Sequence, residues 1–288
     1  MLNPKGLKFH QFKVGDIEVT QVFEGAVERP LDPAFARNAS VEDIKSALRA
    51  AGLPDDKVPN SYTVTVIKLG DRQYMFDSGN GQASGNPNIG LLGENLKAAG
   101  IDAAKLSGII ITHFHPDHIF GLMTKDNAQV YPDTEIVVPA AEYGYWADPG
   151  VIAKLPEARQ GIAKRVQATM VNWKNLRQHS GETEVVPGIR AVATPGHTAG
   201  HTSYHVSAGN GQFMVLGDIS NNPAFNVRNP GWHLAVDQDA QTAEASRRRM
   251  FERLAAENIM ASGYHWGMPG AGMVRREGDG YAVVPVTA

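Results

Sequence analysis

The residues best suited to chemistry in this sequence crowd into one short stretch, "IIITHFHPDHIFGL", residues 109–122. His113, His115, Asp117 and His118 lie within six positions, directly after an apolar run. Imidazole and carboxylate groups gain nothing from burial by themselves, but together they suit zinc, manganese, iron or cobalt as ligands. Four such groups can hold one crowded ion, or two ions shared between neighbours. We therefore interpret the stretch as a metal-binding motif.

The chain around the motif predicts how these side chains are positioned. Residues 106–112 are apolar and rich in isoleucine, which favours a strand buried on both faces. His113 and His115 are two residues apart, so an extended backbone directs both side chains the same way. Pro116 blocks further strand pairing, and a helix is expected to begin there. The cluster thus follows a rigid strand at the point where the chain leaves the sheet.

Composition narrows the class of protein. The 288 residues are 42% hydrophobic and 20% charged, as in an ordinary globular protein with ample material for a core. The formal net charge of −3 gives no electrostatic reason to expect nucleic acid or an anionic membrane as a partner. The sequence has no cysteine, which excludes disulfides and zinc–thiolate sites.

No targeting or membrane-spanning segment is expected. The N-terminal stretch "MLNPKGLKFHQFKVGDIEVT" lacks the continuous apolar core of a signal peptide. No part of the chain reaches the roughly 18 consecutive apolar residues that a membrane span requires. A cytoplasmic location is therefore the prediction, although a signal peptide removed earlier would leave no trace in this sequence.

Short β-rich runs alternate with helical patterns along the whole chain, which indicates an α/β fold or a layered α+β fold. A hairpin that turns at Gly70-Asp71 is predicted from residues 62–70 and 72–79. Five further β-rich runs are predicted at residues 134–140, 188–196, 201–208, 212–218 and 271–286. Helices are predicted at residues 40–52, 89–100, 156–176 and 237–258. With no internal repeat or long linker, residues 1–288 are interpreted as one domain and 141–176 as a helical excursion within it.

The motif "THFHPDH" resembles the metal-binding signature of the metallo-β-lactamase superfamily, whose members carry H-x-H-x-D-H after a buried strand. The resemblance requires a later histidine in a glycine-rich context, an aspartate ending an apolar strand, and a histidine near the C-terminus. The chain meets these requirements in order, with His197 in "ATPGHTAGHT", Asp218 in "FMVLGD" and His265 in "IMASGYHWG". An upstream "FDSG" matches the family's D-x-G element and makes Asp77 an expected supporting aspartate.

Carried over position by position, the resemblance implies a dinuclear metal site. The implied ligands are His113, His115 and His197 for one ion, Asp117, His118 and His265 for the other, and Asp218 as the bridge. The implied fold is the αββα sandwich, in which two mixed sheets pack face to face with helices outside. Zinc is the expected metal, with manganese, iron and cobalt as alternatives.

Several differences from the family's branches narrow the comparison. Antibiotic-hydrolysing members of the commonest type use a cysteine where this chain has Asp218. Nucleic-acid-processing, glutathione-thioester-hydrolysing and flavin-dependent members carry further domains that this sequence lacks. The chain resembles the single-domain group that includes bacterial lactonases and methyl parathion hydrolase, and within it most resembles the methyl parathion hydrolase branch. Acyl-homoserine lactonases have a tyrosine three residues after the bridging aspartate, and Asn221 at that position argues against a dedicated quorum-signal lactonase.

The residues around the motif are predicted to form a substrate pocket. Phe114 and Trp146 occupy places that resemble aromatic positions beside the metals in the methyl parathion hydrolase branch, and Asn221 is a third candidate. His201 is expected to support the metal site. Three other aromatic residues are interpreted as core packing: Tyr143, Phe225 and Trp232. Four histidines are interpreted as structural or surface residues: His10, His179, His205 and His233.

The favoured hypothesis is a dinuclear hydrolase of lactones or aryl esters, with organophosphate triesters as additional substrates. Two metals that share a water lower its pKa from about 15.7 toward 7 and so supply a bridging hydroxide. Asp117 is expected to bind metal and to carry the proton to the leaving group. A dedicated phosphotriesterase is the second hypothesis, and a diiron redox or metal-dependent ligand-binding protein is the third. Since related enzymes are often homodimers, a homodimer is one expected assembly.

Overall fold

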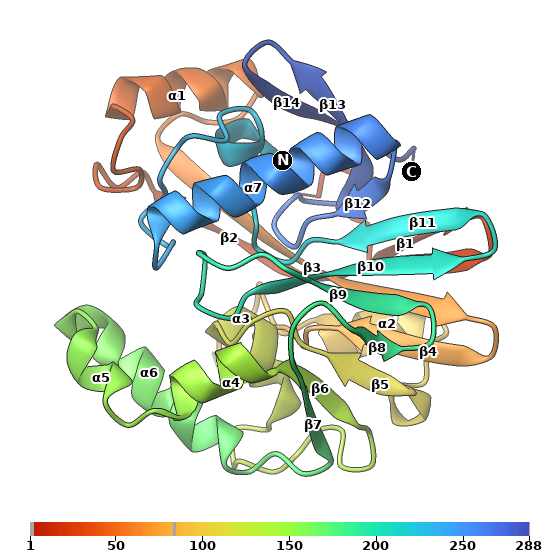
Figure 1. Cartoon of the computed structure of the whole chain (residues 1–288). Coiled ribbons are helices and arrows are strands. Elements are labelled where there is room, and N and C mark those ends of the chain that lie inside the picture. Colours follow the sequence, from red (N-terminus) through yellow and green to blue (C-terminus); the bar gives the residue numbers. More distant parts are fainter. Residues whose placement is uncertain (1–2, 83–84, 288) are drawn as a thin grey trace.

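Two β-sheets form the centre of the molecule. They are described here from a computed structural model of the chain, covering residues 3–82 and 85–287. Within these residues each sheet has seven strands, and helices lie on the outer side of both sheets (Figure 1). This layered arrangement is the predicted αββα sandwich.

The first sheet is antiparallel at one side and parallel at the other. In spatial order its strands are β1 (Phe9–Val14), β2 (Ile17–Pro30), β3 (Lys57–Leu69), β4 (Arg72–Phe76), β5 (Gly108–Ile110), β6 (Ile136–Pro139) and β7 (Leu176–His179). The pairs from β1 to β4 are antiparallel, and those from β4 to β7 are parallel. Parallel strands require crossover connections, which here run through the helical segments.

The second sheet is mostly antiparallel. Its strands in spatial order are β14 (Gly280–Pro285), β13 (Ala271–Glu277), β12 (Met260–Ser262), β11 (Gly211–Val215), β10 (Thr202–Ala208), β9 (Ile189–Ala193) and β8 (Glu184–Val186). Strands β11 and β12 are its parallel pair. They are joined through the longest helix of the described residues, α7 (Ala240–Glu257).

Alternation of side chains along the strands builds the layers. In β6, Ile136 and Val138 pack in the cluster beneath the outer helices, whereas Val137 packs between the two sheets. In the second sheet, Phe213 enters the cluster between the sheets, and Met214 packs toward α7. Because successive side chains of a strand point to opposite faces, each sheet contributes to two cores at once.

The helices cover the outer faces and one end. Besides α7 they are α1 (Val41–Ala50), α2 (Leu92–Ala98), α3 (Pro116–Ile119), α4 (Ala140–Ala147), α5 (Val151–Lys154) and α6 (Glu157–Met170), with shorter helical turns at η2 (Ala103–Lys105), η3 (Phe120–Leu122) and η4 (Pro223–Val227). Helix α7 lies over the second sheet, and α4 to α6 lie on the far side of the first (Figure 1). None of the helices in the described ranges is both long enough and apolar enough to cross a membrane.

Several predicted elements are confirmed. The hairpin forms as β3 and β4, pairing Thr65 with Phe76 and turning at Gly70, whose φ of 61° suits glycine. The helix predicted at 40–52 forms as α1 and begins with a capping box: the backbone N–H of Asp43 donates to Ser40 Oγ, and that of Ser40 donates to the Asp43 carboxylate. The predicted excursion at residues 141–176 contains α4, α5 and α6.

Other boundaries differ from the prediction. The run at 271–286 is a hairpin of β13 and β14 rather than one element. The helix predicted from residue 237 begins at Ala240, because Asp239 caps it by accepting from the backbone N–H of Thr242. The helix predicted through 176 ends at Met170, and β7 follows. Strands β1, β2, β7, β8 and β12 were not predicted.

Candidate metal centre

The candidate metal centre lies where strands of both sheets end. Asp77 directly follows β4, and His113 comes three residues after β5. In the second sheet His197, Asp218 and His265 follow β9, β11 and β12 within a few residues. Strands β4 and β5 run parallel, as do β11 and β12, so their carboxyl ends open at a common edge. Helix α3 begins at Pro116, as predicted, with His115 as its N-cap residue.

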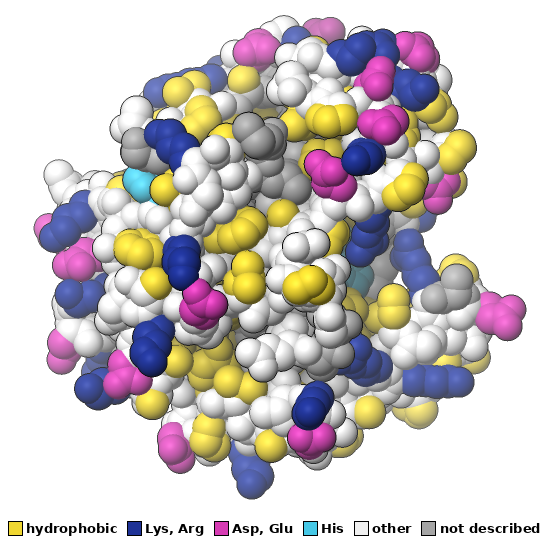
Figure 2. Space-filling model, turned by 180° about the vertical axis from the view of Figure 1, so that it is seen from behind, with side chains coloured by type: hydrophobic (Ala, Val, Ile, Leu, Met, Phe, Trp, Pro, Cys, Tyr) yellow, Lys and Arg dark blue, Asp and Glu magenta, His cyan; other side chains and the backbone are white. Residues whose placement is uncertain are grey.

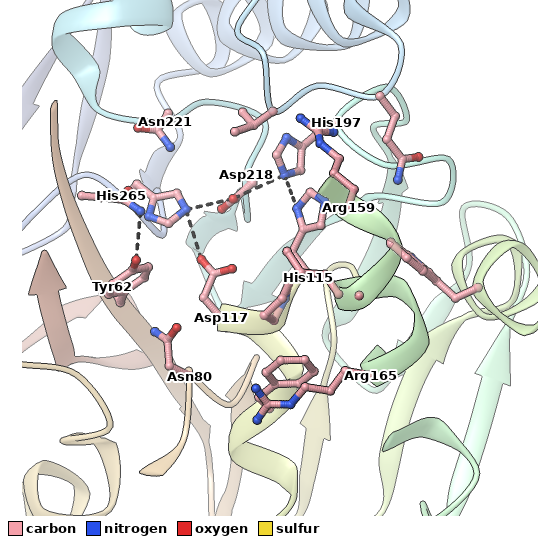
Figure 3. Close-up of a pocket in the computed structure, with 18 of the residues that line it drawn as sticks. Tyr62, Asn80, His115, Asp117, Arg159, Arg165, His197, Asp218, Asn221 and His265 are labelled. Carbon is pink, nitrogen blue, oxygen red and sulfur yellow. Dashed lines mark hydrogen bonds and ion pairs between the residues drawn. The ribbon is translucent and has the colours of Figure 1, made fainter. Parts of the chain in front are cut away.

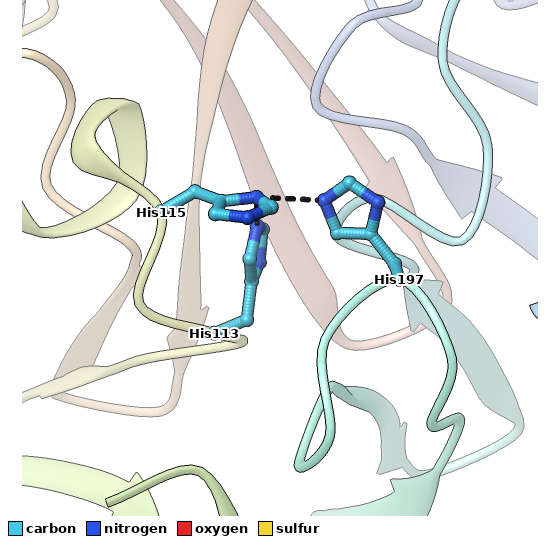
Figure 4. A group of neighbouring side chains, drawn as sticks. All are labelled: His113, His115 and His197. Atoms are coloured by element: carbon cyan, nitrogen blue, oxygen red, sulfur yellow. Dashed lines mark hydrogen bonds between the residues drawn. The ribbon is translucent and has the colours of Figure 1, made fainter. Parts of the chain in front are cut away.

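Three histidines form the first group of the centre. The Nδ1 atom of His115 lies 3.1 Å from His113 Nε2 and 2.9 Å from His197 Nε2 (Figure 4). The Oδ2 atom of Asp218 lies 3.5 Å from His197 Nε2 and 3.9 Å from His113 Nε2. Three ring nitrogens therefore face one point, beside a carboxylate oxygen.

Four residues form the second group. Asp117 Oδ2 lies 3.5 Å from both His118 Nε2 and His265 Nε2. The two oxygens of Asp218 reach both histidines: Oδ1 is 3.3 Å from His118 Nε2, and Oδ2 is 2.9 Å from His265 Nε2. Asp218 thus belongs to both groups, and the seven residues proposed from the sequence are brought together at one place.

Two unpaired atoms test whether this set suits metal ions. His118 Nε2 and Asp218 Oδ1 are buried, and although they lie 3.3 Å apart, neither makes a hydrogen bond with any described residue. Buried polar atoms without partners are costly in folded proteins and require an explanation. Within each group the candidate donor atoms lie within 4.8 Å of one another. Imidazole nitrogens and carboxylate oxygens in this arrangement fit two divalent ions of the zinc type.

Most of the histidines are held by an acceptor on the ring nitrogen that faces away from the centre. Nδ1 of His118 donates to Asp77 Oδ2 at 2.7 Å, and Nδ1 of His265 donates to the carbonyl oxygen of Ser61 at 2.7 Å. Nδ1 of His197 donates to Asp237 Oδ1 at 3.0 Å. Such partners fix the tautomer and leave Nε2 with a free lone pair, as a metal ligand needs.

The two residues predicted to support the centre lie in direct contact with it. Asp77, whose φ is 63°, accepts from the backbone N–H and the hydroxyl of Thr112 as well as from His118. Thr112 Oγ1 in turn lies 3.0 Å from His113 Nδ1. The backbone N–H of Asp218 donates to His201 Nε2 at 3.0 Å. Both residues therefore position ligands without facing the centre themselves.

Burial and charge set the protonation of the two groups. Burial lowers the pKa of His115 to about 3 and that of His113 well below its ordinary value, which keeps these imidazoles neutral. Burial acts on His265 in the same direction, but the Asp218 carboxylate outweighs it and raises the pKa. The carboxylates thus stabilise positive charge in the second group, whether that charge comes from a proton or from a metal ion.

A cavity of about 680 Å³ opens above the centre (Figure 3). Trp146 and Asn221 line it, as predicted from the sequence. Phe114 does not line it, contrary to the prediction: its side chain is fully buried and packs on Trp173 at a ring distance of 5.1 Å. The physical reason is strand alternation, since the residue between two histidines that point one way must point the other.

The remaining aromatic and histidine candidates lie away from the cavity. Phe225 is fully buried in the cluster next to α1, and Trp232 packs against that cluster. Tyr143 packs against the core beneath the outer helices. His179 lies 3.0 Å from the Tyr204 hydroxyl. The cavity lining among the described residues includes neither these four nor His10, His205 and His233.

Comparison with known proteins identifies the family. The metallo-beta-lactamase superfamily matches residues 57–262, a range that contains all but one of the candidate ligands. The chain belongs to the metallo-β-lactamase superfamily. The unmatched ligand, His265, lies just beyond that range.

Curated members of the superfamily resemble part of the chain. An N-acyl homoserine lactonase from Bacillus sp is 32% identical over 108 residues, which cover 38% of this chain and 36% of the relative. An N-acyl homoserine lactonase from Bacillus cereus is 28% identical over 121 residues, 42% of this chain and 41% of the relative. The matched region thus spans less than half the length of these relatives.

Solved structures of the superfamily share the fold over nearly the whole chain. The structure of AidC, a dizinc quorum-quenching lactonase in complex with a product, aligns with a TM-score of 0.91 at 24% identity, covering 97% of this chain and 98% of AidC. The hydrolase AbOPH aligns with a TM-score of 0.89 at 23% identity, covering 99% of both chains. At this identity the likeness establishes the fold alone.

Three functionally placed residues were missed by sequence reasoning. Glu142 is fully buried and accepts from the backbone N–H groups of Phe114 and Gly200 and from the indole of Trp146. Asp237 holds His197, and Tyr62 lines the cavity. The one available signal was a glutamate four residues before a tryptophan in a short apolar helix, which suggests a buried acceptor for the indole.

Proposed function

We propose that the protein is a dinuclear metal-dependent hydrolase that opens lactones or cleaves aryl esters. The observation that carries this proposal is Asp218, whose two oxygens reach both ligand groups at the floor of a cavity large enough for a small molecule. The names of the curated relatives and of AidC support lactones as the substrate class.

The ligand set determines what the centre can do. His113, His115 and His197 would hold one ion, Asp117, His118 and His265 the other, and Asp218 would bridge them. Two divalent ions bound there would supply a nucleophile from water at neutral pH and polarise a substrate oxygen. We propose zinc for both ions, with manganese, iron or cobalt as alternatives that the same donors accept.

Asp117 is the proposed proton carrier. Its side chain lines the cavity, and its exposed fraction of 20% is the largest among the carboxylates of the centre. Burial would raise its pKa, but His118 and His265 beside it lower the pKa to about 2. Asp117 is therefore ionised at neutral pH and able to accept a proton, which it passes to the leaving alkoxide or phenoxide.

Tyr62 and Asn221 are proposed to orient the substrate. Burial raises the pKa of Tyr62 to about 12, so its hydroxyl keeps its proton at neutral pH. That hydroxyl accepts from Asn60 Nδ2 at 3.1 Å, which leaves its own proton for an oxygen of the substrate. Asn221 lines the cavity and offers an amide. Tyr62 of β3 thus supplies a phenol at the cavity. Asn221 occupies the position at which acyl-homoserine lactonases have a tyrosine.

The first experiment measures metal content by mass spectrometry together with initial rates. The substrates are an aryl ester, an aromatic lactone, an acyl-homoserine lactone and a paraoxon-type triester. We expect two equivalents of metal and chelator-sensitive turnover of a lactone or ester. Turnover of the triester alone would favour the phosphotriesterase alternative, and two metals without any turnover would leave a redox or ligand-binding role.

Asp218→Ala tests the assignment directly. Loss of the bridge is expected to remove at least one metal equivalent and to lower kcat/KM by about a hundredfold or more, since the metals supply the reaction's nucleophile. Asp126→Ala, in an exposed loop, is the matched control. A variant of Asp218 that keeps two metals and a near-normal rate would contradict the proposal.

A further inference from the structure

The cavity above the metal centre carries positive charge from three arginines. Arg29, Arg159 and Arg165 line it, whereas its acidic residues among those described are only Asp117 and Asp218. Figure 2 shows Lys and Arg side chains gathered around a hollow on this side of the molecule. Asp117 and Asp218 both lie against His118 of the centre. Neither carboxylate therefore neutralises a guanidinium group.

The three guanidinium groups have no carboxylate partner among the residues that the structure describes. Arg159 Nη2 donates to the carbonyl oxygen of Ala235 at 2.5 Å, and Arg165 lies over the ring of Phe120, 4.0 Å from its centroid. Some arginines elsewhere are paired, for example Arg177 with Glu135 at 2.8 Å, whereas Arg37 and Arg190 contact only backbone carbonyl oxygens. The cavity therefore holds three guanidinium groups that no carboxylate of the described residues neutralises.

Helix α6 carries two of them on one face. Arg159, Ile162 and Arg165 are spaced three residues apart, which places them along the side of the helix that lines the cavity. Figure 3 shows Arg159 beside His197 and Arg165 on the other side of His115, toward Asn80. Their side chains are oriented in part by Ala235 and Phe120, which lowers the entropy cost of binding a ligand.

Charge balance at the metal centre does not account for these arginines. Two divalent ions would bring four positive charges, and the lining carboxylates supply two negative ones. Three further positive charges in the same cavity repel a cationic substrate. A neutral substrate does not need these charges in order to bind. Guanidinium groups bind carboxylates and phosphates through paired N–H donors, which suits an anionic group on the ligand.

Apolar side chains line the same cavity as the arginines. Ile162 is 46% exposed and Val236 is 40% exposed, values that are high for large hydrophobic residues in this protein. Leu155 and Trp146 line the same cavity. Such exposed apolar surface in a cavity favours a hydrocarbon segment of the ligand.

We propose that the substrate is an anionic lactone or ester, in which an apolar chain ends in a carboxylate or phosphate group that Arg159 or Arg165 binds. This inference rests on the proposed hydrolase function and specifies its substrate class. The arginines are specificity residues here: they select the charged end of the substrate, and the metal centre acts on the other end.

The test uses three acyl-homoserine lactones of equal chain length whose acyl chains end in a carboxylate, a phosphate monoester or a methyl ester. Rates are measured with the zinc-loaded protein, its Arg159→Gln/Arg165→Gln variant and the control Lys164→Gln. Lys164 lies on the same helix, is exposed and does not line the cavity. Binding of the matching γ-lactams, which lack a cleavable ester, is measured by calorimetry on the same three proteins.

We expect one charged lactone to be preferred over the methyl ester by about tenfold or more in kcat/KM, as charge-assisted hydrogen bonds allow. The double variant should lose this preference through a raised KM for the charged lactone, and Lys164→Gln should keep it. Which charged end is preferred distinguishes carboxylate from phosphate. Equal rates for all three lactones, or a preference that survives in the double variant, would overturn the inference.

The lactams separate this inference from the proposed function. If none of the lactones is hydrolysed, the hydrolase proposal fails for this substrate class, and the lactams still test the anion site. Tighter binding of a charged lactam that depends on Arg159 and Arg165 would then support it. Equal binding of charged and neutral lactams would overturn it.

Discussion

Each candidate ligand histidine that faces the proposed metal centre through Nε2 has an acceptor on its Nδ1, on the far side of the ring. For His197 this acceptor is Asp237, whose other oxygen accepts from Arg247 Nη2 at 3.0 Å. Arg247 is fully buried and also donates to the carbonyl oxygens of Ile219 and Pro230. The orientation of one ligand thus depends on a buried ion pair that also links α7 to the loop after β11.

Replacing Asp237 is predicted to weaken the centre without removing a ligand. Asp237→Asn leaves Arg247 without a charged partner. The amide has a single oxygen to accept from two donors, His197 Nδ1 and Arg247 Nη2. Outer partners of this kind are worth about 10–100-fold in metal affinity. Competition with a chelator of known affinity measures the change, with the exposed helix cap Asp239→Asn as control. Equal metal affinity in parent and Asp237→Asn would show that His197 needs no such support.

Glu24 predicts a pH dependence of stability. It is fully buried, and burial raises its pKa from the ordinary 4.5 to about 7, although Asn80 and the backbone N–H of Gly90 donate to it. Because the folded state holds the proton more tightly, this residue's contribution to stability is complete below pH 4.5. It is lost as the pH rises through 7.

Glu24→Gln should remove this dependence. Between pH 5 and pH 8 the free energy of unfolding of the parent should fall by about 2–3 kcal/mol more than that of the variant, from a pKa difference of about 2.5 units. Urea denaturation at both pH values measures the difference, and titrations common to both proteins cancel. Glu28→Gln, exposed on the same strand, should behave like the parent. Parallel pH profiles for parent and Glu24→Gln would contradict the prediction.

Helix α4 connects the two loops that carry ligands. Its Glu142 accepts from Phe114 N at 2.9 Å, within the H-x-H loop, and from Gly200 N at 2.8 Å, in the glycine-rich loop after His197. A Cβ atom at Gly200 would lie 2.1 Å from the backbone nitrogen of Glu142, so only glycine allows this close approach. The predicted helical excursion therefore also braces the centre.

Glu142→Gln should loosen both loops. Only one of the two carboxylate oxygens remains an acceptor, so the amide group faces a backbone N–H and leaves a buried donor unpaired, at a cost of about 1–3 kcal/mol. Thermal unfolding measures the loss, and chelator-induced metal release should quicken in parallel. Glu157→Gln, exposed in the first turn of α6, provides the control. If Glu142→Gln is less stable but releases metal at the rate of the parent, Glu142 contributes to folding and not to metal retention.

The two sheets meet at the metal centre as well as in the core between them. His113, His115, Asp117 and His118 follow β5 of the first sheet, and the remaining three ligands follow strands of the second. Metal ions bound by both sets would cross-link the sheets at their open edge. A ligand that binds only the folded state stabilises it in proportion to the logarithm of its concentration over Kd.

Chelation is therefore predicted to lower the stability of the whole molecule. Metal at a hundred times its Kd adds about 2.7 kcal/mol to the free energy of unfolding. For a chain of this size the corresponding fall in Tm on removal is about 5 °C or more. Calorimetric scans with and without a chelator, followed by zinc addition, measure the fall and its recovery. An unchanged Tm after verified metal removal would show that the sheets pack without the cross-link.

The sequence by itself predicted candidate metal ligands at residues 113–118 and a layered fold, and the structure confirms the layers. Histidine and aspartate at fixed spacings behind apolar runs have few uses other than metal binding, and strand alternation is a local property of the backbone. The resemblance to the metallo-β-lactamase superfamily supplied the distant ligands His197, Asp218 and His265. That residues 1–288 form one domain, that the protein is a homodimer and that it is cytoplasmic stay predictions.

Only the tertiary structure decided which other side chains meet the centre. Glu142, Asp237 and Tyr62 come from segments far from the motif, and no local pattern distinguishes a buried carboxylate that accepts backbone N–H groups from an exposed one. The exclusion of Phe114 and the convergence of Arg29, Arg159 and Arg165 on one cavity likewise depend on how helices and strands pack. Spacing along the chain fixes which residues share an element's face, but packing alone decides what that face touches.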